Sequence, residues 1–136
     1  LPGILKTDRV RPEVPLPQGG RLDFAVELAG KTAFLEVKSV TWVEGGVALF
    51  PDGVTARGRR HLQELVNLVR QGHQAWNVFV VQRQDARVMR PAVRVDPAYA
   101  RELAAAAAAG VGILVLQEKI APPEITLASP LPFDLT

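Results

Sequence analysis

Three charged residues carry the chemistry that this sequence offers most directly. Glu36 and Lys38 lie two residues apart, and Asp23 precedes them. Two carboxylates beside an ammonium suit metal-assisted hydrolysis of a phosphodiester, because a hard divalent cation neutralises phosphate charge and acidifies an attacking water. Asp23 and Glu36 would supply the oxygen ligands, and Lys38 would orient the water or stabilise the transition state. The cation would be Mg²⁺ or Mn²⁺, since the chain has no cysteine to offer a soft ligand.

Two predicted strands must position these residues. Residues 21–28 alternate between apolar and polar side chains, which predicts a half-buried strand, and residues 33–41 form a second strand after a turn at 29–32. Side chains two residues apart on a strand point the same way, so Glu36 and Lys38 share one face of the second strand.

The predicted pairing of these strands brings Asp23 to the same face. If Leu28 pairs with Ala33 across the turn, Asp23 lies opposite Lys38 and diagonal to Glu36. A slip of one residue would send Asp23 to the opposite face. The Glu-x-Lys spacing by itself is weak evidence, because it also fits a solvated strand face with a cross-strand ion pair.

A basic cluster opens the helix that is predicted over residues 55–71, with Thr55 as its N-cap. The cluster consists of Arg57, Arg59, Arg60 and His61. Guanidinium groups beside a helix N-terminus can hold phosphates, so these residues are candidates for nucleic-acid binding. The alternative interpretation is a solvent-exposed helix face, since arginine is also a good helix former.

The remaining segments complete a mixed α/β pattern. They are an extended lead-in over 1–20, strands over 47–50, 76–82 and 111–116, a second helix capped by Asp96 and ending at Gly110, and an irregular tail from Ala121. The resulting order of elements, β-β-β-α-β-α-β, predicts a mixed sheet with helices packed on it.

The composition is that of an ordinary globular domain. Of 136 residues, 48% are hydrophobic and 22% are charged, and 16 basic residues against 14 acidic ones give a net charge of +2. This balance excludes a mainly disordered chain, and no apolar run is suited to span a membrane. Because no signal peptide is apparent, we expect a cytoplasmic protein.

These segments also resemble the sugar fermentation stimulation protein A (SfsA) family through a series of ordered motifs. The motifs are Arg21-Leu22-Asp23-Phe24, Glu36-Val37-Lys38-Ser39-Val40-Thr41, Phe50-Pro51-Asp52, Val54-Thr55 with Arg57-Gly58 and His61-Leu62, Asp96-Pro97 with Tyr99-Ala100, Gly110-Val111 and Pro130-Leu131-Pro132. Together they extend over nearly the whole chain, which makes them far more specific than the Glu-x-Lys spacing alone.

The resemblance implies a restriction-endonuclease-like fold of the PD-(D/E)xK type over residues 21–136, preceded in full-length members by an OB-like domain that has no counterpart here. It implies DNA binding without sequence preference and a regulatory role in sugar (maltose) metabolism. By position, Asp23 and Glu36 match the metal-binding acids of the family, Lys38 matches the catalytic lysine, and Glu13 matches a further acidic residue that could be a metal ligand.

Three hypotheses follow from the sequence. The first is a Mg²⁺- or Mn²⁺-dependent nuclease that acts on DNA through Asp23, Glu36 and Lys38. The second is a DNA-binding regulator that keeps the nuclease architecture without turnover. The third is a metal-binding scaffold or interaction domain whose arginines contact another protein. The complete set of acids and lysine favours the first hypothesis, because a module that only binds DNA does not need acids where phosphates approach.

Overall fold

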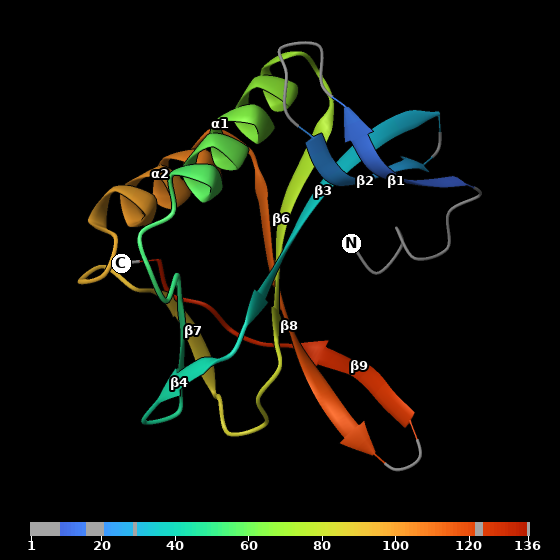
Figure 1. The fold of residues 1–136 in the computed structure, drawn as a ribbon. Helices are drawn as coiled ribbons and strands as arrows, with labels where there is room; N and C mark the ends of the chain where they lie inside the picture. Colours follow the sequence, from blue (N-terminus) through green and yellow to red (C-terminus); the bar gives the residue numbers. More distant parts are fainter. Residues whose placement is uncertain (1–8, 16–20, 29, 122–123, 136) are drawn as a thin grey trace.

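The first two predicted strands form an antiparallel hairpin. They are β2 (Arg21–Leu28) and β3 (Lys31–Val40), and β1 (Arg9–Pro15) pairs with the other edge of β2. The computed structural model, shown as a ribbon in Figure 1, describes residues 9–15, 21–28, 30–121 and 124–135. β1 therefore lies within the lead-in expected over 1–20, while the rest of that segment falls outside the described residues.

The turn between β2 and β3 is shorter than predicted. Leu28 pairs with Lys31, so the turn has two residues rather than four, and the predicted pairing of Leu28 with Ala33 is wrong. Gly30 permits this turn, because its φ of +78° lies in the left-handed region that glycine adopts without steric cost. The register shift equals two residues, so it does not exchange the two faces of the strands.

β6 (Gln74–Val81) lies near the middle of a six-stranded sheet with the order β1-β2-β3-β6-β8-β9. It pairs in parallel with β3 on one side and with β8 (Gly112–Ala121) on the other. Its apolar run over residues 78–81 predicted a central strand, and this position confirms the prediction.

The irregular tail that we predicted from Ala121 is wrong. β9 (Glu124–Pro130) pairs antiparallel with β8 and forms an edge of the sheet. The prolines of this segment argued against a strand, but Pro130 ends an edge strand, where a missing N–H group costs no ladder hydrogen bond on the open side.

A second, three-stranded sheet contains β4 (Trp42–Glu44), β5 (Val47–Phe50) and β7 (Val88–Pro91). Only β5 was predicted from the sequence. β4 and β7 have three and four residues, which is too short for an alternating pattern to be recognised.

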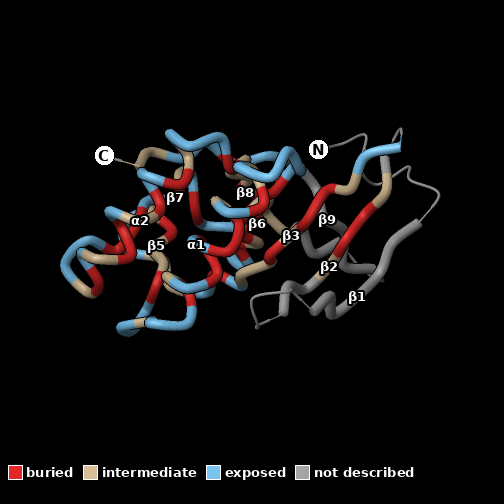
Figure 2. The backbone as a smooth tube through the Cα atoms, turned by 90° about the horizontal axis from the view of Figure 1, so that it is seen from above, coloured by how far each residue is buried: buried red, intermediate tan, exposed pale blue. Residues whose placement is uncertain are grey.

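Both predicted helices are present and are confirmed as α1 (Ala56–Arg70) and α2 (Pro97–Ala108). They lie side by side (Figure 1) and connect parallel strands, as helical crossovers do. Leu62 and Leu65 of α1 pack in one core with Phe79 of β6, and Figure 2 shows the buried stretches of these elements next to one another. Neither helix of the described chain is long and apolar enough to cross a membrane.

Asp96 links the N-termini of the two helices. It caps α2 by accepting the backbone N–H of Tyr99 at 3.0 Å, and it also accepts the N–H of Thr55 at 2.9 Å. Thr55 is itself the N-cap of α1 and accepts the N–H of Gly58 at 2.9 Å. The N–H groups of Thr55 and Tyr99, with the positive charge of nearby Arg59, lower the pKa of the Asp96 carboxyl.

Replacing Asp96 with alanine is expected to lower the free energy of unfolding by about 1–2 kcal/mol at neutral pH, because a capping acceptor is lost. Since the folded state favours the charged carboxylate, its stabilisation is complete above the ordinary carboxyl pKa of about 3.9 and is lost as the pH falls through the lower folded value. Urea unfolding of both proteins between about pH 7 and pH 3 measures the effect. A difference in unfolding free energy that did not shrink in acid would contradict this explanation.

Candidate active site

β3 places Glu36 and Lys38 on the face that α1 covers, and their predicted sharing of one face is confirmed. The Glu36 side chain is 3% exposed, the Lys38 side chain is 14% exposed, and Lys38 Nζ lies 3.7 Å from Glu36 Oε1. A buried carboxylate is costly unless a cation or a hydrogen-bond donor compensates it. Lys38 is a cation in the required place.

His61 of α1 contacts both of these residues. Its Nδ1 atom lies 2.9 Å from Lys38 Nζ and 3.3 Å from Glu36 Oε2. In the tautomer with its proton on Nε2, His61 accepts a hydrogen bond from the Lys38 ammonium through Nδ1, whereas a protonated Nδ1 would donate to Glu36. In this arrangement the ammonium of Lys38 is held between the carboxylate and the imidazole.

Burial separates His61 from the arginines with which the sequence grouped it. Its side chain is 4% exposed and points toward β3 instead of lying on the outer surface of α1. The contact between His61 and nucleic acid stays a prediction.

The backbone register brings three acidic positions into one row across the sheet. Pro12 of β1 pairs with Phe24 of β2, so the next position along β1, Glu13, stands opposite Asp23. The register between β2 and β3, continued by one residue past Phe24, puts Asp23 opposite Glu36.

The predicted pairing of Asp23 with Lys38 is wrong, because the observed register of β2 and β3 differs from the predicted register by two residues. The correction follows from the shorter turn, and it brings Asp23 nearer to Glu36 along the strands than the predicted diagonal did. The side chains of Asp23 and Glu13 fall outside the described residues, so their roles as metal ligands stay predictions.

The predicted basic cluster divides between two sides of α1. Arg57 and Arg60 are exposed and lie three residues apart, on the same side of the helix. Arg59 is half-buried, and its charge acts on Asp96 at the start of α2. Of the three arginines in the cluster, Arg57 and Arg60 are therefore the ones exposed to solvent.

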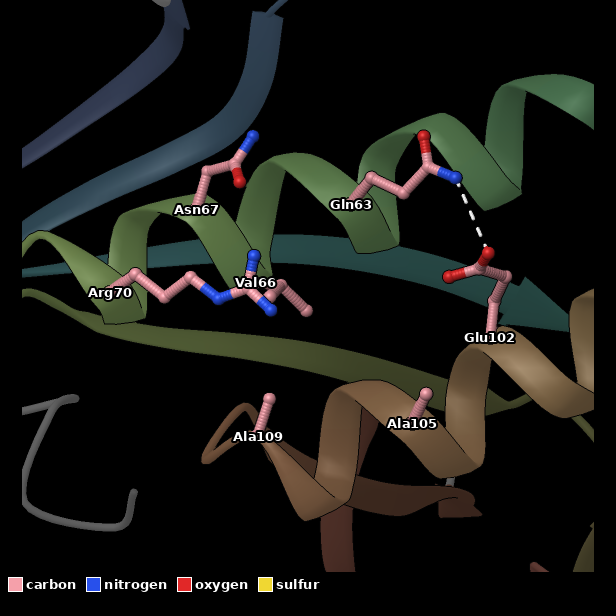
Figure 3. Close-up of a pocket in the computed structure, with 7 residues that line it drawn as sticks. All are labelled: Gln63, Val66, Asn67, Arg70, Glu102, Ala105 and Ala109. Atoms are coloured by element: carbon pink, nitrogen blue, oxygen red, sulfur yellow. Dashed lines mark hydrogen bonds between the residues drawn. The ribbon is translucent and has the colours of Figure 1, made fainter.

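A groove of about 230 Å³ between α1 and α2 is separate from this site. Figure 3 shows its lining, in which Gln63 Nε2 donates a hydrogen bond to Glu102 Oε1 at 3.3 Å. None of the residues in this lining is one that the sequence predicted for a functional site.

Two buried polar residues near Glu36 were missed by the sequence analysis. Asn77 is the register partner of Glu36 on β6 and is fully buried. Tyr99 is fully buried at the start of α2, and this burial raises its pKa, with a further rise from the negative charges of Glu36 and Asp96. Asn77 could have been recognised as the single polar residue in the apolar strand 75–81. Tyr99 gave no such signal, because its neighbours come from distant segments.

Glu64 is a third buried polar residue, one helical turn after His61 on α1. Burial raises the pKa of its carboxyl group, and the positive charge of Arg60 opposes that rise. Its position three residues after His61 places both side chains on neighbouring parts of the inner helix surface.

The donor types at this site fit a hard divalent cation. Glu36 offers carboxylate oxygens, which are the ligands that Mg²⁺ and Mn²⁺ prefer. Among the residues with described side chains, no three of the types His, Cys, Asp and Glu lie close enough together to hold a metal ion. A complete ligand set would therefore draw on Asp23 and Glu13, whose backbone positions are in the same row as Glu36.

Comparison with known sequences gives consistent matches. The profile of the family described as the sugar fermentation stimulation protein RE domain matches residues 1–124. The sugar fermentation stimulation protein homolog of Citrifermentans bemidjiense is 46% identical over 124 residues, which cover 91% of this chain and 54% of the relative. The homolog of Maricaulis maris is 42% identical over 131 residues, covering 95% and 56%. The chain thus spans about half the length of the curated relatives it matches.

A solved structure supports the same relationship. The structure of Pyrococcus furiosus SfsA in complex with Ca²⁺ matches this one with a TM-score of 0.84 and 32% sequence identity. The match covers 91% of this chain and 54% of that chain. The mixed α/β architecture described above is therefore the architecture of the matched part of that protein.

Gly58, three residues before His61, lets α1 approach Tyr99 closely. A Cβ atom on Gly58 would lie 3.0 Å from Tyr99 Cε2 and 2.8 Å from Thr55 Cγ2. Replacing Gly58 with alanine is therefore expected to lower stability by about 1–3 kcal/mol through overpacking, although alanine favours a helix by about 1 kcal/mol. Thermal unfolding measures the loss.

The matched control is Gly53→Ala in the loop before α1. A Cβ atom on Gly53 meets nothing within 4 Å, so this change should leave the unfolding temperature nearly unaltered. Equal effects of the two substitutions would show that Gly58 is not a contact point.

Proposed function

The chain belongs to the sugar fermentation stimulation protein family, and on this premise we propose that it binds DNA and hydrolyses its phosphodiester bonds at a Mg²⁺- or Mn²⁺-dependent site of the PD-(D/E)xK type. The observation that carries the proposal is the buried contact between Glu36 and Lys38 on β3, with His61 against both. A nuclease needs a carboxylate and an ammonium in such a place, whereas a binding module does not.

The acids would hold the cation. Glu36, with Asp23 and Glu13 in the same row of the sheet, would bind a divalent ion that neutralises phosphate charge and acidifies water. The P. furiosus relative is in complex with Ca²⁺, another hard cation with oxygen ligands, which supports divalent binding in this family.

Lys38 would act on the phosphate itself. Its ammonium would donate hydrogen bonds to the non-bridging oxygens as negative charge builds up on them, and donors placed in this way stabilise such transition states strongly. His61 Nδ1 lies 2.9 Å from Lys38 Nζ, so the imidazole restrains the lysine beside Glu36. The low exposure of both side chains strengthens these interactions, because little water screens them.

DNA binding would use the outer surface of α1. Arg57 and Arg60 are exposed on one side of the helix, close in sequence to the buried His61. Their guanidinium groups can contact backbone phosphates without reading sequence, which agrees with binding that has no sequence preference.

A second candidate function is DNA binding without catalysis, as a regulator of sugar (maltose) metabolism. The observation that favours it is the short contact between Lys38 and His61, since a lysine that is fully engaged within the protein has fewer donors left for a substrate. A test of DNA cleavage separates the two candidates directly.

Replacing Lys38 with alanine is expected to reduce cutting of supercoiled DNA in Mg²⁺ or Mn²⁺ by about 100-fold or more, because a charge-stabilising donor is removed. Gel electrophoresis of the products measures cutting, and calorimetry with Mn²⁺ is expected to show that metal binding persists. Lys31→Ala is the matched control, since Lys31 is an exposed lysine on the same strand. Unchanged cutting by the Lys38 variant would remove this residue from the mechanism.

Replacing Arg57 or Arg60 with alanine is expected to weaken DNA binding and to reduce the slope of log affinity against log salt by about 0.9 for each lost phosphate contact. Fluorescence anisotropy with a labelled duplex at several salt concentrations gives the slope. Arg59→Ala should cost stability as well, because Arg59 lies near Asp96.

Arg101→Ala, at an exposed position on α2, is the control for this series and should leave the slope unaltered. If the Arg57 and Arg60 variants behave like the Arg101 variant, the surface of α1 is not the DNA contact.

A further inference from the structure

Two fully buried polar side chains beside Glu36 lack hydrogen-bond partners among the described residues. They are Asn77, with both its Oδ1 and Nδ2 atoms, and Tyr99, with its hydroxyl group. Native proteins satisfy nearly all such atoms, so the exceptions indicate a bound water or ion, or a functional role.

Both residues are close to Glu36. Asn77 is its register partner on a strand that lies about 4.8 Å away, and paired residues of parallel strands point to the same face. Burial raises the pKa of Tyr99, and the negative charge of Glu36 adds to the rise, so the carboxylate lies within electrostatic range of the phenol group. The Tyr99 ring packs edge-on against the Phe50 ring, with 5.4 Å between the ring centroids. The Phe50 and Phe79 ring centroids are also 5.4 Å apart. Phe79 is two residues from Asn77 on the same strand face.

The chemistry of these groups suits a shared hydration site. A buried water typically makes about three hydrogen bonds to polar groups that have no other partner. Asn77 offers one acceptor and two donors, and the Tyr99 hydroxyl offers a donor. A tyrosine hydroxyl is protonated at neutral pH, since its ordinary pKa is about 10, so Tyr99 can donate toward the negative side of the site.

We propose that Asn77 and Tyr99 are positioning residues that hold the Glu36 carboxylate through buried water, so that it is directed at the cation. The idea rests on the proposed function, because it assigns Glu36 a cation to face. Partners of this kind, which contact a metal ligand and not the metal, fix the orientation of that ligand, and their loss typically weakens metal binding by about 10- to 100-fold.

The first experiment measures binding of Mn²⁺ alone by calorimetry to the wild-type chain, Tyr99→Phe and Asn77→Leu. We expect each variant to bind Mn²⁺ about 10-fold more weakly or worse. Leu103→Ala is the control for stability, since Leu103 is a fully buried apolar residue one turn after Tyr99 on α2. It should lower the unfolding temperature without altering Mn²⁺ affinity. Wild-type affinity in both the Tyr99 and Asn77 variants would overturn the proposal.

The second experiment needs no metal. Thermal unfolding in a chelator compares Tyr99→Phe, Glu36→Gln and the double variant. If Tyr99 contacts Glu36 through water, Tyr99→Phe lowers the unfolding temperature and the two effects fail to add. If the Tyr99 hydroxyl were isolated, its removal would leave stability unchanged or raise it. The effects of Tyr99→Phe and Glu36→Gln on the unfolding temperature would then add, and this result would overturn the proposal. Val26→Ala, in a separate buried cluster, is the control that should be additive with Tyr99→Phe.

The two experiments keep this inference distinct from the proposed function. If the wild-type chain does not bind Mn²⁺, the proposed metal site fails, and the unfolding experiment still decides whether Asn77 and Tyr99 support Glu36. If the wild-type chain binds Mn²⁺ and the variants bind equally well, only the positioning role fails.

Discussion

The contact of Glu36 with Lys38 and His61 constrains much of the surrounding fold. A carboxylate that is 3% exposed would be strongly destabilising alone, so the fold must supply a cation and polar partners within a few ångströms. Lys38 comes from the same strand, which requires only the alternation of β3. His61 comes from α1, so the helix must lie at a defined position over the sheet. Only then can the imidazole of His61 contact both Lys38 and Glu36.

Contacts at the first turn of α1 fix where the helix lies over the sheet and which of its sides faces the core. Asp96 binds the N–H of Thr55 and caps α2, so the starts of the two helices form one unit. Gly58 then allows the first turn of α1 to lie against Tyr99. With the helix held in this way, its inner surface carries His61 and the leucines of the core, and Arg60 faces solvent. One amphipathic helix thus serves the core, the buried polar site and a basic surface.

Local sequence signals predicted the parts of this arrangement that depend on local rules. The shared face of Glu36 and Lys38 follows from the period of a strand, and both helices were recognised from their caps. The β2–β3 register was wrong because it depends on the two-residue turn that Gly30 permits. Neither the inward direction of His61 nor the place of Asn77 beside Glu36 could be derived, because each depends on how distant segments pack. The short strands β4 and β7 contain too few residues to show a period.

Anomalous diffraction from crystals soaked in Mn²⁺ would show whether Glu36 belongs to a divalent-metal site. We expect a peak about 2.1–2.3 Å from a carboxylate oxygen of Glu36. We also expect an oxygen of Asp23 or Glu13 to complete the coordination and Lys38 to stay within reach of the cation. Well-diffracting crystals in which Mn²⁺ is bound elsewhere and not to Glu36 would contradict the proposed metal site.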